Sequence, residues 1–103
     1  MNLKGTFPTL ILEALAEEPS HGYRIAQTIK ERSRGLLDFK EGTLYPALHK
    51  LENEMKVESY NRVENGRTRR YYRITTAGRK MLTKDRAEWR ALSQAVTMIL
   101  GEA

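Results

Sequence analysis

The pair Asn65-Gly66, set between two runs of strand-forming residues, constrains the fold more than any other feature of this sequence. The runs extend from Val57 to Glu64 and from Thr68 to Thr75. An Asn-Gly pair is a preferred two-residue loop of an antiparallel hairpin, because both residues tolerate a positive φ angle. We therefore predict a β-hairpin in the second half of the chain.

Two helical segments are predicted before this hairpin. The apolar run Phe7 to Ala16 covers most sides of a helix, and Pro8 fits its first turn. Ser20 is expected to be the N-cap of a second helix from about His21 to Ser33. Arg34-Gly35 is expected to end that helix, because glycine favours a left-handed C-terminal stop.

A third helix is predicted from roughly Gly42 to Met55. Its apolar stripe at helical spacing consists of Leu44, Leu48, Leu51 and Met55. Pro46 is expected in the first turn of this helix, where its missing amide hydrogen costs little. The segment Leu36 to Phe39 is too short for a helix, and we expect it to pair as a short strand.

After the hairpin, Thr75 or Thr76 is expected to cap a last helix that extends toward Ile99. The predicted order of elements is therefore helix, helix, helix, hairpin and long helix. The predicted class is mostly α with a small β-hairpin (α+β). Three helices followed by a hairpin form a winged helix-turn-helix, which we assign to residues 1–75. Residues 76–103 are the long C-terminal helix.

The composition narrows the classes of function. The 18 Lys and Arg residues exceed the 13 Asp and Glu residues, for a formal net charge of +5, which suits nucleic acid, an anionic membrane or an acidic protein. There is no cysteine, and His21 and His49 have no acidic cluster at ligand spacing around them. We therefore expect no metal, no cofactor and no enzymatic activity. Without a membrane-spanning run or a signal peptide, the expected location is the cytoplasm.

The outer face of the third helix carries side chains that can hydrogen-bond phosphates or base edges. With the leucines turned inward, this face consists of Thr43, Tyr45, Pro46, His49 and Lys50, with Asn53 beyond them. An α-helix fits the major groove of DNA. The alternative is an ordinary amphipathic surface helix.

The hairpin is strongly basic. Its arginines are Arg62, Arg67, Arg69, Arg70 and Arg73, opposed nearby by Glu64. Because strand side chains alternate between faces, Arg67 and Arg69 should point one way and Arg70 the other. Alone, this could be a solvated strand edge. A basic hairpin directly behind a polar-faced helix favours double-stranded DNA as the partner.

The last helix carries apolar residues at heptad spacing. Leu82, Trp89 and Val96 are seven residues apart, and Leu92 and Ile99 hold the complementary position, which Asp85 interrupts. Such a seam is typical of a two-stranded helical contact, so we predict a homodimer. The alternative is docking onto the first helix of the same chain, and the helix is long enough for both.

The sequence also contains strings that resemble one known family, the PadR family of bacterial transcriptional regulators. They are Ser20-His21-Gly22-Tyr23, Glu41-Gly42-Thr43-Leu44-Tyr45-Pro46-Ala47-Leu48, Leu51-Glu52, the hairpin from Asn65 to Thr75, and Ala77-Gly78. The short single C-terminal helix is similar to that of the small subgroup. One departure is Met55-Lys56-Val57-Glu58, where the family tends to have a glycine-led turn into the wing, so the third helix is expected to extend further.

The resemblance implies a homodimer that binds a pseudo-palindromic operator and usually represses, often until a small molecule releases it. By position, Thr43, Tyr45, Pro46, His49 and Lys50 would face DNA, His21 and Tyr23 would support them, and Gly66, Arg67 and Arg69 would reach in from the wing. Trp89 would bind a planar aromatic effector at the dimer interface, although a tryptophan at a heptad core position more often serves packing. A protein-interaction module and a small-molecule sensor remain the alternative functions.

Overall fold

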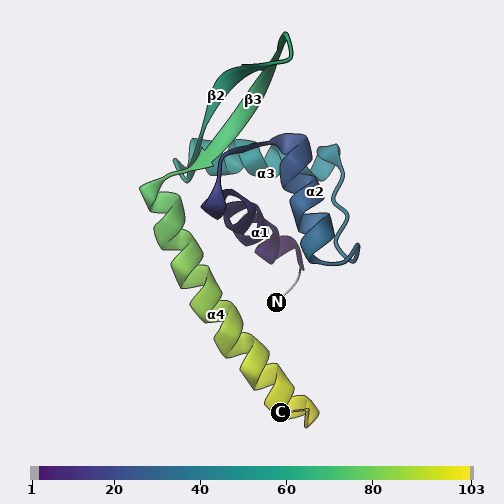
Figure 1. The fold of residues 1–103 in the computed structure, drawn as a ribbon. Coiled ribbons are helices and arrows are strands. Elements are labelled where there is room, and N and C mark those ends of the chain that lie inside the picture. Colours follow the sequence, from purple (N-terminus) through teal and green to yellow (C-terminus); the bar gives the residue numbers. More distant parts are fainter. Residues whose placement is uncertain (1–2, 103) are drawn as a thin grey trace.

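The computed structural model describes residues 3–102 and contains four helices and a small antiparallel sheet in that range (Figure 1). In chain order the elements are α1 (Leu3–Glu17), β1 (Ser20–His21), α2 (Gly22–Arg32), α3 (Glu41–Asn53), β2 (Val57–Glu64), β3 (Arg67–Ile74) and α4 (Thr76–Leu100). The strand order is β1-β3-β2. The predicted α+β winged-helix class with a long last helix is therefore confirmed.

The hydrophobic core lies where α1, α2, α3 and the base of the sheet meet. Its fully buried side chains are Ile11, Leu12, Leu15, Ile25, Leu44, Leu48, Leu51, Val57 and Tyr72. Three of the four residues in the predicted stripe of α3 are in this group, while Met55 is exposed. The helical spacing of the leucines is thus what turns the polar side of α3 outward.

The hairpin has the predicted boundaries to within a residue. The β2 and β3 strands pair from Val57 opposite Ile74 to Glu64 opposite Arg67. Asn65 and Gly66 have φ angles of 50° and 75°, the left-handed values that a two-residue type I′ turn requires. Thr75 lies outside β3 and instead caps α4, where its hydroxyl accepts the amide hydrogen of Gly78.

The two helix prolines are not in first turns as predicted. Pro8 and Pro46 are each the sixth residue of α1 and α3. Each removes the amide that would close an intrahelical hydrogen bond. The predicted start of α3 near Gly42 is nevertheless correct to within a residue, because its first backbone bonds run from Thr43 and Leu44 to the carbonyl of Lys40.

The end of α3 corrects the expectation of a longer helix at Met55-Lys56. The helix stops at Asn53, and Met55 adopts a left-handed φ of 60°. The amide of Lys56 donates to the carbonyl of Leu51 at 2.8 Å, and that of Met55 donates to Glu52 at 3.0 Å, the Schellman pattern. Methionine therefore occupies the conformation that a glycine-led turn would use.

Two expectations about short segments were wrong. Ser20 is buried in β1 opposite Tyr72 instead of capping α2, and His21 is the N-cap. The segment from Leu36 to Phe39 is a loop rather than a strand. Phe39 anchors this loop on α1, with its ring centroid 4.0 Å from that of Phe7.

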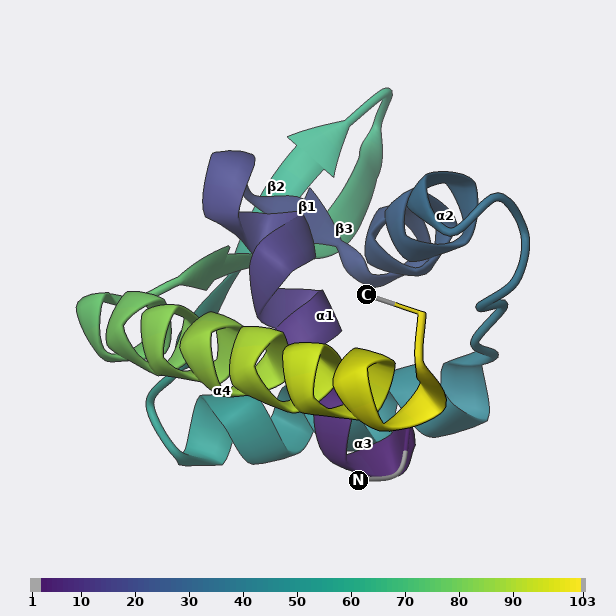
Figure 2. The same cartoon turned by 90° about the horizontal axis from the view of Figure 1, so that it is seen from below.

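The first half of α4 docks on α1, and the second half extends beyond it (Figure 1). Seen from below, α4 crosses in front of α1 (Figure 2). Leu82 is 4% exposed and belongs to the core described above. The Thr9 hydroxyl donates to the Asp85 carboxylate at 2.8 Å, and Arg86 pairs with Glu13. Leu82 thus serves the contact within the chain that the sequence left open as the alternative to dimerisation.

Candidate nucleic-acid interface

The hairpin rises from the edge of α3, while α4 runs away from it toward the opposite end of the molecule (Figure 1). The α3 helix and the wing, as we name the β2–β3 hairpin with its Asn65-Gly66 turn, therefore lie at the same end of the fold. This is the arrangement in which a helix can enter a groove of DNA while a hairpin reaches the adjacent backbone.

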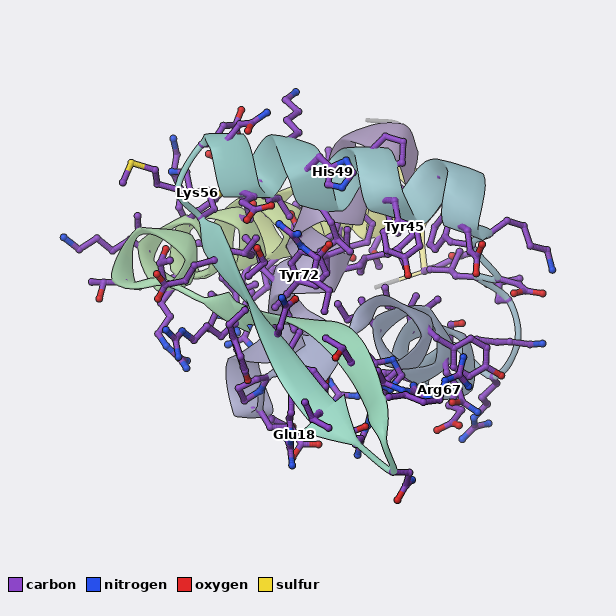
Figure 3. All side chains as sticks on the ribbon, turned by 90° about the horizontal axis from the view of Figure 1, so that it is seen from above. Glu18, Tyr45, His49, Lys56, Arg67 and Tyr72 are labelled. Atoms are coloured by element: carbon purple, nitrogen blue, oxygen red, sulfur yellow. The ribbon has the colours of Figure 1, made fainter. Side chains whose placement is uncertain are left out.

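The outer face of α3 presents most of the predicted side chains to solvent. Thr43, Pro46, His49 and Lys50 are all exposed. Figure 3 shows His49 on the outward side of α3, with Tyr45 nearer to α2. The two rings are 6.5 Å apart between centroids. Hydroxyl, imidazole and ammonium groups thus stand on one free helical surface, where they can hydrogen-bond a ligand.

Tyr45 is half-buried, because its ring packs against the start of α2. A Cβ atom placed on Gly22 would stand 2.6 Å from the Tyr45 hydroxyl oxygen, so any side chain there would require the Tyr45 ring to move. Glycine at this position therefore lets α2 and α3 approach. Tyr45 both joins the two helices and borders the outer face of α3.

His21 lies where α2, β1 and β3 meet. The amide of Arg24 donates to its Nδ1 atom at 3.3 Å, and Nη1 of Arg69 lies 3.0 Å from its Nε2 atom. A neutral imidazole has one acceptor nitrogen, so it accepts from one of these donors at a time. Burial, followed by the positive charges of Arg69 and Arg24, lowers the pKa of His21 against the opposing effect of Glu64. Tyr23, beside it, is 66% exposed.

One face of the wing carries an ion-pair cluster around Glu64. Its carboxylate accepts the Tyr71 hydroxyl and lies 3.4 Å from Nε of Arg62 and 3.8 Å from Nε of Arg69. The Tyr71 hydrogen bond is the main reason that the pKa of Glu64 lies below its usual value. Arg69 is therefore engaged between Glu64 and His21, while Arg67 is exposed at the tip beside Gly66.

The other face of the wing is tied to α3. The Glu52 carboxylate accepts the hydroxyl of Ser59 on β2 and lies 3.3 Å from Nη2 of Arg70 on β3. The same guanidinium donates to the Ser59 hydroxyl oxygen at 2.7 Å. Sequence reasoning missed this group. The strand alternation, which places Arg70 opposite to Arg69 as predicted, was the signal that could have found it.

No other kind of site stands out within residues 3–102. In that part of the chain there is no group of three or more His, Cys, Asp or Glu residues that could hold a metal ion. Neither is any described helix long and apolar enough to cross a membrane. An open cleft of about 620 Å³ lies between α2, the following loop and the start of α3, with Tyr23, Phe39 and Leu44 in its lining.

Similar proteins are found among both sequences and solved structures. A protein of Mycobacterium tuberculosis described as a transcriptional regulator is 44% identical over 91 residues, which are 88% of this chain and 79% of that protein. A transcriptional regulator from Clostridium thermocellum has a similar structure, with a TM-score of 0.86 and 34% identity over 93% of this chain and 94% of that one. A PadR family transcription regulator from Clostridium difficile gives a TM-score of 0.82 and 32% identity over 93% and 99% of the two chains.

Residues 11–84 match the family described as the transcriptional regulator PadR-like family. That range begins within α1 and ends within α4, so it includes the outer face of α3, the His21 cluster and the whole wing. The match therefore covers every surface described in this section. The chain belongs to the PadR-like family of transcriptional regulators, which are DNA-binding proteins of the winged-helix type and not enzymes.

Proposed function

We propose that this protein is a sequence-specific repressor that binds a pseudo-palindromic operator as a homodimer. Residues 1–75 bind double-stranded DNA, and residues 76–103 hold the two copies together. The observation that carries the proposal is the exposed polar face of α3 beside a basic wing, on one side of the molecule.

In this proposal α3 reads base edges and the wing binds backbone. Thr43, His49 and Lys50 enter the major groove, with Pro46 and the edge of Tyr45 against the bases or sugar. Arg67 and Gly66 reach the phosphates or the minor groove from the wing tip.

The two side chains at the base of the wing act in support. His21 lies beside Tyr23 and Arg69, and Arg69 must leave Glu64 or share it to reach a phosphate. The wing contribution should therefore strengthen binding with little discrimination between bases.

The dimer is assigned to the free half of α4. Trp89, Leu92, Val96 and Ile99 form an exposed apolar row beyond the segment that docks on α1. A second copy of the same helix is a partner that could cover this row. Two recognition helices related by a two-fold axis would then enter successive major grooves about 34–36 Å apart.

Selection from a random duplex library at near-physiological salt tests the proposal. We expect recovery of a two-fold pseudo-palindrome with half-sites about one turn apart. Replacing Arg67 and Arg69 by alanine should weaken binding to all duplexes. It should also reduce the slope of log affinity against log salt concentration by the equivalent of about one to two phosphate contacts per half-site. His49→Ala should instead change sequence preference. Enrichment of no sequence by a folded wild-type dimer would reject DNA reading by this surface.

A second candidate function is binding of a planar aromatic effector at Trp89. The observation that favours it is that the indole is 51% exposed within an apolar row. Offset stacking of a flat ring on an indole is a favourable contact. Because Trp89 is the single tryptophan, quenching of its fluorescence by planar dyes tests this role directly. Quenching that persists in Trp89→Phe protein would come from tyrosine and reject it.

A further inference from the structure

The contact between α3 and the wing has a polar part as well as an apolar one. The apolar part consists of Leu48, Leu51, Val57 and Tyr72, all of which are fully buried. At its edge lie Glu52 on α3, Ser59 on β2 and Arg70 on β3, which we call the bracket. Figure 3 shows Tyr72 between α3 and the strands, so the bracket closes the edge of a packed contact.

The bracket joins all three elements through charged hydrogen bonds. Arg70 bonds both the Glu52 carboxylate and the Ser59 hydroxyl oxygen, and Glu52 accepts from Ser59. The Ser59 hydrogen bond, with the Arg70 charge, lowers the pKa of Glu52 below its usual value despite burial. The side chain of Glu52 is 29% exposed and that of Arg70 56%, so the acid is partly shielded from water while the guanidinium stays largely solvated.

A second acid–arginine pair in the same hairpin joins the two strands only and does not involve α3. Glu58 on β2 pairs with Arg73 on β3 at 3.0 Å, and both side chains are more than half exposed. These two residues face each other across the strands and contact no residue of α3 through this pair. The hairpin therefore offers an internal control for the bracket.

The bracket lies at the base of the hairpin, so a small rotation there causes a large displacement of the tip. Asn65 is six positions after Ser59, which is roughly 20 Å of extended strand. A rotation of about 10° at the base would therefore move the tip by roughly 3–4 Å over that length. A displacement of that size breaks a hydrogen bond to a phosphate oxygen.

We propose that Glu52 is a positioning residue that sets the direction of the wing relative to the recognition helix. Through Arg70 and Ser59 it holds the tip, with Arg67, at the distance from α3 that one groove of the operator requires. The proposal rests on the proposed DNA-binding function, but its first consequence is a property of the protein without DNA. Glu52 itself does not touch DNA.

The test compares Glu52→Gln with the matched control Glu58→Gln. In the free protein, amide hydrogen exchange across residues 60–71 should become roughly tenfold faster in Glu52→Gln and stay near wild type in Glu58→Gln. Circular dichroism and thermal unfolding establish that each variant is folded. Arg70→Gln, which changes an exposed side chain, should reproduce the faster exchange and replaces Glu52→Gln if that variant does not fold.

The second measurement uses a duplex selected by the wild-type protein. Hydroxyl-radical footprinting should show loss of protection at the outer phosphates of each half-site in Glu52→Gln, with the central bases still protected. The salt slope should fall by about one per half-site. Unchanged exchange, an unchanged footprint edge, or equal effects in Glu58→Gln would each overturn the proposal. If wild-type protein selects no duplex, the proposed function fails, and the exchange experiment still decides the role of the bracket.

Discussion

The two halves of α4 share one heptad spacing of apolar residues but have different surroundings. Leu82, in the first half, is buried against the core, and Asp85 and Arg86 beside it bond to α1. Seven residues after Leu82, Trp89 is 51% exposed, and Val96, a further seven on, is 44% exposed. The same pattern thus serves a contact within the chain and then leaves an uncovered row.

This difference arises because α1, on which α4 docks, is the shorter helix. The α1 helix has 15 residues and α4 has 25, so α4 extends past the end of α1. A heptad pattern reports which side of a helix is apolar, but it carries no information about whether the covering surface belongs to the same chain. Effects of substitutions that depend on protein concentration should therefore distinguish the second half of α4 from the first.

The largest effect is expected for Leu82→Ala. Removing a buried leucine side chain costs its transfer free energy and leaves a cavity, together about 2–5 kcal/mol of unfolding free energy. Urea denaturation should show this loss equally at every protein concentration. In Leu92→Ala the loss should shrink as the protein is diluted, because a contact with a second copy weakens by mass action. Equal, concentration-independent losses in both variants would contradict the division of α4.

The next effect concerns assembly. Val96→Asp places a charge in the row that is exposed in the single chain. A second copy would bury this charge without a partner, so the dimer dissociation constant should rise by about 100-fold or more. Sedimentation should then give the mass of one chain instead of two, with unchanged helix content. Gln94→Asp is the matched control, because Gln94 lies on the opposite side of the helix and is exposed. Dissociation by both variants would indicate a general charge effect.

The elements predicted correctly are those specified by neighbouring residues. The Asn65-Gly66 turn needs positive φ angles that few other pairs adopt, and the leucine spacing of α3 defines its buried side within four turns. The outward position of His49 follows from that spacing. The general location of the candidate DNA surface was therefore predictable from the sequence.

The elements that were missed depend on contacts between distant residues. Ser20 has a typical N-cap side chain, but pairing with Tyr72 places it in a strand and passes the cap to His21. Pro8 and Pro46 are tolerated inside helices that tertiary packing holds together. The bracket at Glu52 and the approach of Tyr45 to Gly22 likewise join elements whose relative placement no local pattern specifies.

A smaller effect is expected at Asp85, which interrupts the apolar row. A sequence-based argument would replace it with leucine to complete the seam. Because Asp85 accepts a hydrogen bond from Thr9 at 2.8 Å in the docked half, Asp85→Leu should lower the unfolding free energy by about 1 kcal/mol. It should leave the dimer dissociation constant unchanged. Thr9→Val removes the same bond from the other side, so the two losses should not add. Tighter dimerisation of Asp85→Leu would place this position in the interface.

The smallest effect is spectroscopic and locates the boundary between the two halves. Trp89 is the first large exposed apolar residue after the docked segment and the single indole of the chain. If a second copy covers it, its emission should shift to shorter wavelength as protein concentration rises through the dimer dissociation constant, because the indole leaves water. Val96→Asp protein should keep the emission of the dilute wild type over the same range. An emission maximum that is independent of concentration, in samples that sedimentation shows to be changing from monomer to dimer, would place Trp89 outside the interface. The row that holds the dimer would then begin at Leu92, and Trp89 would remain open to ligands in both states.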